Sequence, residues 1–231
     1  ANDVKNRTQA LKVLEVKSQP KMIKPPKPLI TSSFVRLMAA ALKLTTKEAM
    51  SAAQTLFERG LITYHRTDSP VMSQEFASTL RDFAVRHKLP LPKTSREFKA
   101  KANAQEGHEC LRVTDINVTN ARAAGIDDRL LQAVYQLVWK ITLESQLADA
   151  VEEETIVSFM NAHNDCFVSR SKAPKELGWR KASIQFNATD DAKAATESLN
   201  LDEENNIDEV QQKQLPDLAT NETLKPVRLD I

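Results

Sequence analysis

The densest group of chemically useful side chains lies in residues 60–69, Gly-Leu-Ile-Thr-Tyr-His-Arg-Thr-Asp-Ser. The stretch 61–64 is typical of a strand. If the strand continues through Arg66, Tyr64 and Arg66 emerge on one face and His65 on the other, because side chains alternate along a strand. A phenol is a weak nucleophile at neutral pH, and a neighbouring guanidinium can hold phosphate oxygens and stabilise the charge that develops during attack. The pair could therefore act on a phosphodiester, although spacing alone does not establish this.

Three polar residues directly after Arg66 can support such a site. Thr67, Asp68 and Ser69 offer a carboxylate and two hydroxyls, which could orient Arg66 or contact a phosphate backbone. Asp68 or Ser69 could equally cap the helix that follows. Spacing alone also leaves a second interpretation open, in which Tyr64 is a structural tyrosine that packs its ring and hydrogen-bonds its hydroxyl.

Apolar residues at helical spacing predict four helices, at about 34–42, 49–57, 76–84 and 127–141. The expected N-caps of the first three are Ser32 or Ser33, Thr45 or Thr46, and Ser73. Gly60 suits the left-handed position that ends the second helix. The first two helices and the strand at 61–64 have the pattern of a helix-turn-helix with a wing. Tyr135, Trp139 and Trp179 lie in apolar periodicity and are predicted to pack in the core.

The order of these elements predicts two domains. Residues 21–28 are a linker by composition, because prolines at three of the last four positions exclude a helix. A polar, helix-like start precedes the linker, and strand-like sequence follows residue 149, at 155–159, 166–168 and 182–186. The predicted fold is α+β, with a mainly helical winged-helix (CAP-like) domain at 24–148 inserted in a β-rich domain formed by residues 1–23 and 149–231. We expect the acidic residues 190–213 to form a mobile surface loop.

The composition is that of a globular protein, with 41% apolar residues available for a core. The net charge of +1 conceals an uneven distribution: residues 1–112 hold 20 basic against 10 acidic residues, and residues 113–231 hold 12 against 21. The first part could therefore face phosphates. Cys110 and Cys166 stand alone, so neither a zinc site nor a disulfide is indicated. No apolar run is long enough to cross a bilayer and no signal peptide is recognisable, so we expect a cytoplasmic excerpt of a longer polypeptide.

Residues 60–69 are similar to the nucleophile motif of type IA DNA topoisomerases, and Tyr64 stands at the position of their active-site tyrosine. Residues 104–115, Ala-Gln-Glu-Gly-His-Glu-Cys-Leu-Arg-Val-Thr-Asp, resemble the family segment Ala-Gln-Glu-Ala-His-Glu-Ala-Ile-Arg-Pro-Thr-Asp, in the form typical of the bacterial topoisomerase I branch. The resemblance implies that His108 lies beside Tyr64 and contacts the phosphate of the scissile strand. It also makes Arg112 a candidate DNA-binding or supporting residue. Without the family, His108 could be a loop histidine or a metal ligand.

The sequence departs from the family pattern at a few positions, which do not include Tyr64, Arg66 or His108. Gly107 and Cys110 replace alanines, Val113 replaces a proline, and His65 stands where methionine or proline is more usual. These changes suggest a divergent member of the family, for example one carried by a mobile element.

The resemblance implies an ATP-independent isomerase that relaxes negative supercoils by breaking and rejoining single-stranded DNA through a 5′-phosphotyrosine link at Tyr64. In the family, a Toprim domain supplies an acidic cluster that binds Mg²⁺, and further domains complete the DNA groove. No such cluster is recognisable here, so we expect the chain to contain the helical nucleophile-bearing domain and most of a β-rich hinge or arch domain. We further expect it to bind single-stranded DNA weakly, to hold no metal, to need the Toprim domain for activity and to bind no membrane. We expect the parent enzyme at the bacterial nucleoid or on plasmids.

Two other functions remain open at this stage. The chain could be a noncatalytic winged-helix DNA-binding module with Tyr64 and Arg66 on its wing. It could also be a scaffold that keeps the fold without the chemistry.

Overall fold

The structure is a computed structural model that describes residues 10–99, 109–186 and 218–224. The chain separates into two compact units. Among the described residues, one unit comprises 10–23, 151–176 and 218–224, and the other comprises 24–99, 109–150 and 177–186. The coarse prediction of a mixed α and β protein is confirmed. The predicted loop at 190–213 lies outside the described residues.

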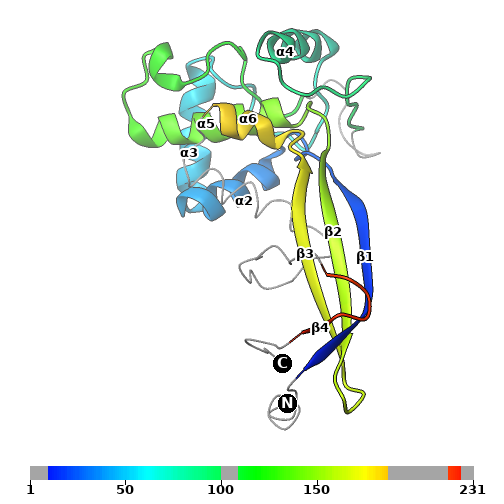
Figure 1. The fold of residues 1–231 in the computed structure, drawn as a ribbon. Helices are drawn as coiled ribbons and strands as arrows, with labels where there is room; N and C mark the ends of the chain where they lie inside the picture. Colours follow the sequence, from blue (N-terminus) through cyan, green and yellow to red (C-terminus); the bar gives the residue numbers. More distant parts are fainter. Residues whose placement is uncertain (1–9, 100–108, 187–217, 225–231) are drawn as a thin grey trace. The chain divides into compact units, whose positions relative to one another are not determined.

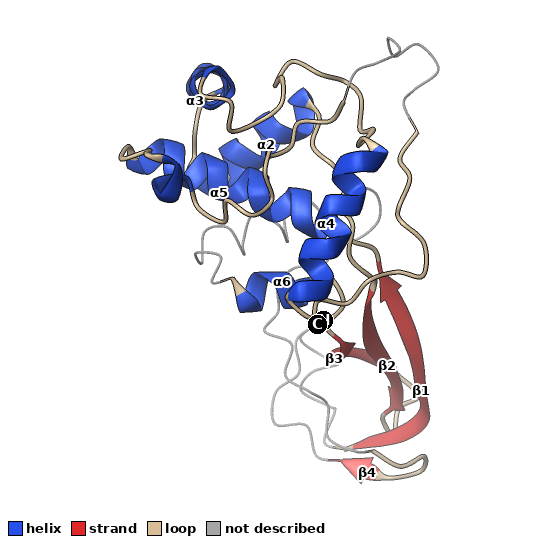
Figure 2. Cartoon of the chain, turned by 90° about the horizontal axis from the view of Figure 1, so that it is seen from above, coloured by secondary structure: helices blue, strands red, loops and turns tan. Residues whose placement is uncertain are grey.

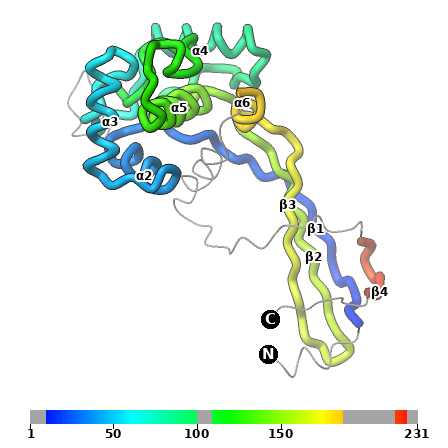
Figure 3. Tube along the Cα trace, turned by 90° about the vertical axis from the view of Figure 1, so that its left-hand side faces the viewer, coloured from blue at the N-terminus to red at the C-terminus, as the bar shows by residue number. Residues whose placement is uncertain are grey.

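The first unit is a four-stranded sheet with the strand order β3-β2-β1-β4. Its strands are β1 (Leu11–Ile23), β2 (Ala150–Met160), β3 (Cys166–Glu176) and β4 (Thr223–Leu224). The three long strands run side by side in Figures 1 and 3. The pairs β2–β3 and β1–β4 are antiparallel, and a register shift between Val151 and Glu152 interrupts the first of them. The core of this sheet is small and is formed by Leu11, Val13, Val157 and Phe159.

The helix-like interpretation of the chain start was wrong where the structure describes it, because residues 11–23 form β1. Leu11 and Val13 are both buried while Lys12 between them is exposed, which is the alternation of a strand with one covered face. β1 lies beside β2 in the sheet, and the hydroxyls of Ser18 on β1 and Thr155 on β2 form a hydrogen bond of 2.9 Å. The polar composition of β1 reflects its exposed positions and not a helical face.

The second unit is helical. It contains α2 (Thr31–Leu42), α3 (Thr46–Glu58), α4 (Gln74–Arg86), the short 3₁₀ helix η1 (Ala121–Ala124), α5 (Arg129–Glu144) and α6 (Arg180–Gln185). Helix α5 contacts α2, α3, α6 and η1 and so occupies the centre of the unit (Figure 2). Its second half is buried nearly all round, which is the pattern of a core helix. Tyr135 and Trp139 are buried as predicted, and their polar ends are satisfied by the carbonyls of Val118 and Ile116.

The helix caps explain where these helices begin. Thr45 and Ser73 cap α3 and α4 as predicted, each accepting a hydrogen bond from a backbone N–H of the first turn. Helix α2 differs from the prediction, because it begins at Thr31 with Ile30 at the N-cap position. Ser33 nevertheless serves this end of the helix, since its hydroxyl accepts a hydrogen bond from the backbone N–H of Ile30 at 2.9 Å. Gly60 has a φ of +71°, the left-handed conformation predicted after α3.

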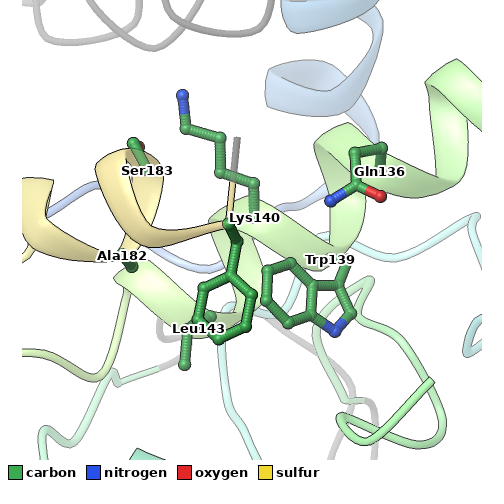
Figure 4. Close-up of a pocket in the computed structure, with 7 residues that line it drawn as sticks. Gln136, Trp139, Lys140, Leu143, Ala182 and Ser183 are labelled. Carbon is green, nitrogen blue, oxygen red and sulfur yellow. The ribbon is translucent and has the colours of Figure 1, made fainter. Parts of the chain in front are cut away.

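Residues 182–186 were predicted as a strand and this was wrong, because 180–185 form α6. Trp179, Ala182 and Phe186 are spaced by three and four residues, and this spacing turns them toward the same neighbour. Ala182 and Ser183 face Trp139 and Leu143 of α5 across a small hollow (Figure 4). The ring of Phe186 lies edge-on to that of Trp139, with 5.0 Å between their centroids. Packing against α5 therefore overrides the local alternation.

Candidate nucleophile site

The segment that carries Tyr64 is not a regular strand, so the prediction of a strand at 61–64 was wrong, and the backbone bends at residues 65 and 66. Residue Ile62 forms an isolated antiparallel bridge with Val113, and Leu29 forms another with Leu111. Further backbone bonds join Thr63 to Arg112 at 2.8 Å, Leu61 to Thr114 at 3.0 Å, and Val71 to Cys110 at 2.7 Å. The segment 61–71 is thus held along its length by residues 110–114. Residues 29–31 hold it from another direction, because Thr31 donates its N–H to the carbonyl of Thr67 at 2.8 Å.

Exposed and buried residues alternate from Tyr64 to Ser69, although these residues do not form a strand. The exposed positions are Tyr64, Arg66 and Asp68, and the buried positions are His65, Thr67 and Ser69. Tyr64 and Arg66 are therefore both exposed. The strand on which their common face depended is absent and the backbone bends at residues 65 and 66, so the common face stays a prediction.

Tyr64 is half exposed, with 50% of its surface accessible, and two aromatic rings contact its ring. The ring of Phe57, from the last turn of α3, meets it edge-on at a centroid distance of 5.3 Å. The imidazole of His65 lies at 5.5 Å, also edge-on. Arg66 is exposed, and no hydrogen bond or ion pair holds its guanidinium among the described residues. A phenol and a guanidinium, two residues apart, are thus both exposed to solvent.

Threonine hydroxyls hold the segment that carries Tyr64. The Thr31 hydroxyl donates to the carbonyl of His65 at 2.9 Å and accepts from the N–H of Thr67 at 2.9 Å. The Thr63 hydroxyl donates to the carbonyl of Cys110 at 2.7 Å and accepts from the N–H of Arg112 at 2.9 Å. Sequence reasoning missed Thr31 and Thr63 as site residues. Alternation does not identify Thr63, because Ile62 is the buried residue before Tyr64 and Thr63 is only half-buried.

Thr67 and Ser69 were predicted either to orient Arg66 or to contact a nucleic-acid backbone, and the structure uses both hydroxyls inside the protein. Thr67 donates to the carbonyl of Glu109 at 2.8 Å and accepts from the N–H of Ser69 at 3.1 Å. The Ser69 hydroxyl accepts from the N–H of Val71 at 3.3 Å. These two residues therefore shape the turn that follows Arg66. Asp68, like Arg66, is exposed.

Arg112 is bound on several sides within the helical unit. Its Nη2 donates to Oε2 of Glu109 at 2.7 Å, and its Nη1 donates to the carbonyl of Val113 at 3.0 Å. Its guanidinium carbon lies 3.9 Å from the ring centroid of Phe76, a close cation–π contact. The second carboxylate oxygen of Glu109 accepts the N–H of Ser73, the N-cap of α4, at 2.7 Å. Of the two roles predicted for Arg112, this geometry fits support.

Glu109, which sequence reasoning did not select, joins the start of α4 to the segment beside Tyr64. Burial alone would raise the pKa of its carboxyl group, but the hydrogen bonds from Ser73 and the charge of Arg112 outweigh burial and lower that pKa below its ordinary value. The carboxylate is therefore ionised at neutral pH and belongs to a closed network. The signal in the sequence was the polar pair three residues apart, Glu109 and Arg112, inside the second motif.

His108 lies outside the described residues. Among the residues that the structure describes, no group of three or more His, Cys, Asp or Glu side chains is placed to hold a metal ion. The two cysteines are free thiols, with Cys110 buried and Cys166 exposed. Burial raises the pKa of the Cys110 thiol to about 12, so it is not a nucleophile at neutral pH. None of the described helices is both long and apolar enough to span a membrane.

Comparison with known proteins gives one consistent result. A family model described as DNA topoisomerase matches residues 1–229. DNA topoisomerase 1 of Escherichia coli is 32% identical over 171 residues, which are 73% of this chain and 20% of that protein. DNA topoisomerase 1 of Synechococcus elongatus is 32% identical over 202 residues, 84% of this chain and 22% of that protein. The chain therefore spans about a fifth of the length of the curated relatives it matches.

A solved structure of full-length topoisomerase I from Thermotoga maritima matches with a TM-score of 0.71. The match covers 97% of this chain and 34% of that one at 22% sequence identity, so it shows the fold alone. The family model and the relatives establish that the chain belongs to the DNA topoisomerase family. Within that family it corresponds to part of the bacterial topoisomerase I, a type IA enzyme.

Proposed function

We propose that this chain carries the nucleophile of a type IA DNA topoisomerase and that Tyr64 forms a 5′-phosphotyrosine link with single-stranded DNA. The observation that carries the proposal is the exposure of Tyr64 and Arg66, two residues apart on a segment held by residues 29–31 and 110–114. A nucleophile and a phosphate-binding group on the same fixed backbone keep their geometry while DNA enters and leaves. Family membership supplies the reaction class.

The reaction needs few steps. The hydroxyl oxygen of Tyr64 gives up its proton and attacks the phosphorus, and the bond from phosphorus to the 3′ oxygen breaks. The 3′ oxygen takes up a proton and leaves as a 3′-hydroxyl, and the 5′ phosphate remains on the tyrosine. Arg66 donates hydrogen bonds to the non-bridging oxygens and stabilises the negative charge of the transition state. Attack by the 3′-hydroxyl on the phosphotyrosine reverses the step and frees Tyr64. One phosphodiester replaces another, so no ATP is required and negative supercoils can relax.

The described residues do not by themselves form the Mg²⁺ site that the family implies. Both carboxylate oxygens of Glu109 are already engaged, by Ser73 and by Arg112. Asp68 stands on the exposed side of the segment without a second acidic group beside it in the sequence. We place the metal in a Toprim domain outside this chain and derive no step from it. The 231 residues alone should bind single-stranded DNA weakly and should not relax supercoiled plasmid.

The finer architecture also belongs to this proposal. Helices α2 and α3 would form the helix-turn-helix of a winged-helix (CAP-like) domain, and the sheet unit would be the hinge or arch in which that domain is inserted. His108 would approach the scissile phosphate beside Tyr64. The chain would act in the cytoplasm, at the nucleoid or on plasmids, as part of a longer polypeptide.

The test is covalent capture of DNA. The chain is mixed with a Toprim-containing fragment of a related enzyme, Mg²⁺ and single-stranded DNA labelled at its 3′ end, and the products are separated under denaturing conditions. We expect a labelled protein band with the wild type and none with Tyr64→Phe. Tyr135→Phe is the matched control, because it removes the other tyrosine hydroxyl, which is bound to Val118 inside the core. A labelled band from Tyr64→Phe would show that another group is the nucleophile.

A noncatalytic DNA-binding module predicts a different result. Helices α2 and α3 pack together and are joined by only three residues, Lys43 to Thr45, as in a helix-turn-helix. If that pair is the functional surface, the wild type binds duplex DNA and yields no covalent product under any of these conditions.

A further inference from the structure

His65, the residue directly after Tyr64, has an unusual environment. Its side chain is fully buried, with 0% of the residue surface accessible. Neither ring nitrogen has a hydrogen-bond partner among the described residues. Buried polar side chains almost always have such a partner, since leaving one unpaired costs roughly 1–3 kcal/mol. The imidazole therefore occupies a place that a purely apolar side chain would fill at lower cost.

Two aromatic rings contact the His65 ring. Its centroid lies 5.5 Å from that of Tyr64 and 6.2 Å from that of Phe57 on α3, and the rings of Phe57 and Tyr64 meet each other as well. The backbone of His65 is fixed independently of its ring, because Thr31 donates to its carbonyl oxygen. The three rings form one cluster, and Tyr64 is its exposed member.

The charge that acts on His65 comes from Arg66. Burial, which favours the uncharged ring, and the adjacent guanidinium of Arg66 both lower the pKa of the His65 imidazole below its ordinary value. Phe57 and Tyr64 contribute aromatic rings. The ring is therefore neutral at neutral pH, and protonation would place a cation among apolar rings and next to another cation.

We propose that His65 is a positioning residue that supports the Tyr64 ring only while its imidazole is neutral. A protonated ring must gain water or a counter-ion, so it leaves the cluster and removes one of the two rings against which Tyr64 rests. The orientation of the Tyr64 hydroxyl then depends on the charge of its neighbour. Together with the proposed role of Tyr64 as nucleophile, on which this consequence rests, it makes DNA cleavage sensitive to acid in a way that methionine at this position would not.

The coupling can be measured on the 231-residue chain without any reaction. The chain contains four histidines and two tyrosines, so ring-labelled histidine and tyrosine give few NMR signals, and His65→Met and Tyr64→Phe assign the two of interest. We expect the His65 ring to titrate below pH 6.5 and the Tyr64 ring signals to shift with the same midpoint. The buried Tyr135 serves as an internal control and should not follow that midpoint. In His65→Met the Tyr64 shift should be absent.

Two results would overturn the proposal. The Tyr64 signals could stay constant while His65 titrates, or they could shift equally in His65→Met, which would assign the effect to another group. If His65→Met does not fold, the wild-type titration still decides, because it compares two signals within one protein.

Covalent capture extends the test to chemistry. Each protein is compared with its own rate of adduct formation at neutral pH. One pH unit below the midpoint of His65, only about a tenth of the rings are neutral, so the wild type should lose about tenfold in rate beyond any loss shown by His65→Met. Equal pH dependence in the two proteins contradicts the inference about His65. Absence of adduct from both at every pH contradicts the proposed function instead, and the NMR titration then decides the inference.

Discussion

Replacing Glu109 by alanine should destabilise the helical unit more than any loss of a surface carboxylate can. The carboxylate makes two charge-assisted contacts of 2.7 Å, one to the N-cap N–H of Ser73 and one to Arg112. Hydrogen bonds to charged groups contribute about 1.5–3 kcal/mol each, and breaking a buried ion pair costs about 3–5 kcal/mol. The side chains of Arg112 and Glu109 retain 11% and 31% of their exposure, so water can compensate for part of the loss. We expect the free energy of unfolding to fall by about 3 kcal/mol.

Urea unfolding followed by tryptophan fluorescence measures this change. Both tryptophans of the chain, Trp139 and Trp179, are buried in the helical unit, so the signal reports that unit. Asp82→Ala is the control, because Asp82 is an exposed carboxylate on α4 and its loss should change stability by about 0.5 kcal/mol at most. A loss below about 1 kcal/mol for Glu109→Ala would refute the assignment of Glu109 as the link between α4 and the segment beside Tyr64.

The same network has a pH dependence of defined sign. The pKa of Glu109 is lowered in the folded protein, so its ionised form contributes stability that is fully present above the ordinary value of 4.5 and is lost as pH falls through the folded value. Glu109→Gln keeps an acceptor for Ser73 but has no charge to lose. The stability difference between wild type and Glu109→Gln should therefore shrink as the solution is acidified.

Two further predictions concern the helical unit and use the same fluorescence assay. Gly178→Ala should abolish folding or lower the free energy of unfolding by several kcal/mol, because a Cβ there would lie 2.2 Å from the carbonyl oxygen of Asp149. Gly125→Ala is the control: its Cβ would meet nothing within 4 Å, and the substitution should cost only about 1 kcal/mol. Equal effects of the two substitutions would contradict the close approach at Gly178. Burial raises the pKa of Glu144 to about 7, so its protonated form is favoured on folding and stability should fall by about 3 kcal/mol as pH rises from 4.5 to 7. Glu144→Gln should remove that slope, and an unchanged slope would assign it to another group.

The helices were predictable because their signals are local. Thr45 and Ser73 cap α3 and α4 through hydrogen bonds to residues three positions further on, and the apolar periodicity of α5 survives in its burial. The wrong predictions concern elements whose structure depends on contacts with segments far away in the sequence. Residues 180–185 became α6 because Trp139 and Glu144 of α5 offered a ring contact to Phe186 and a hydrogen-bond acceptor to Ser183. The strand β1 depends on β2, which lies more than a hundred residues away in the sequence.

In the candidate site, too, local patterns were predictable and contacts between distant segments were not. Alternation predicted that Tyr64 and Arg66 are exposed and His65 is buried, and the structure has this pattern of exposure without the predicted strand. What alternation could not supply was the identity of the partners on the buried side, since Thr31, Glu109 and the carbonyl of Cys110 come from segments far apart in the sequence. The hydroxyls of Thr67 and Ser69, which the sequence offered as DNA contacts, instead form hydrogen bonds within the protein. Among residues 64–69, the exposed side chains are the phenol of Tyr64, the guanidinium of Arg66 and the carboxylate of Asp68, and the buried hydroxyls of Thr67 and Ser69 hold the backbone that carries them.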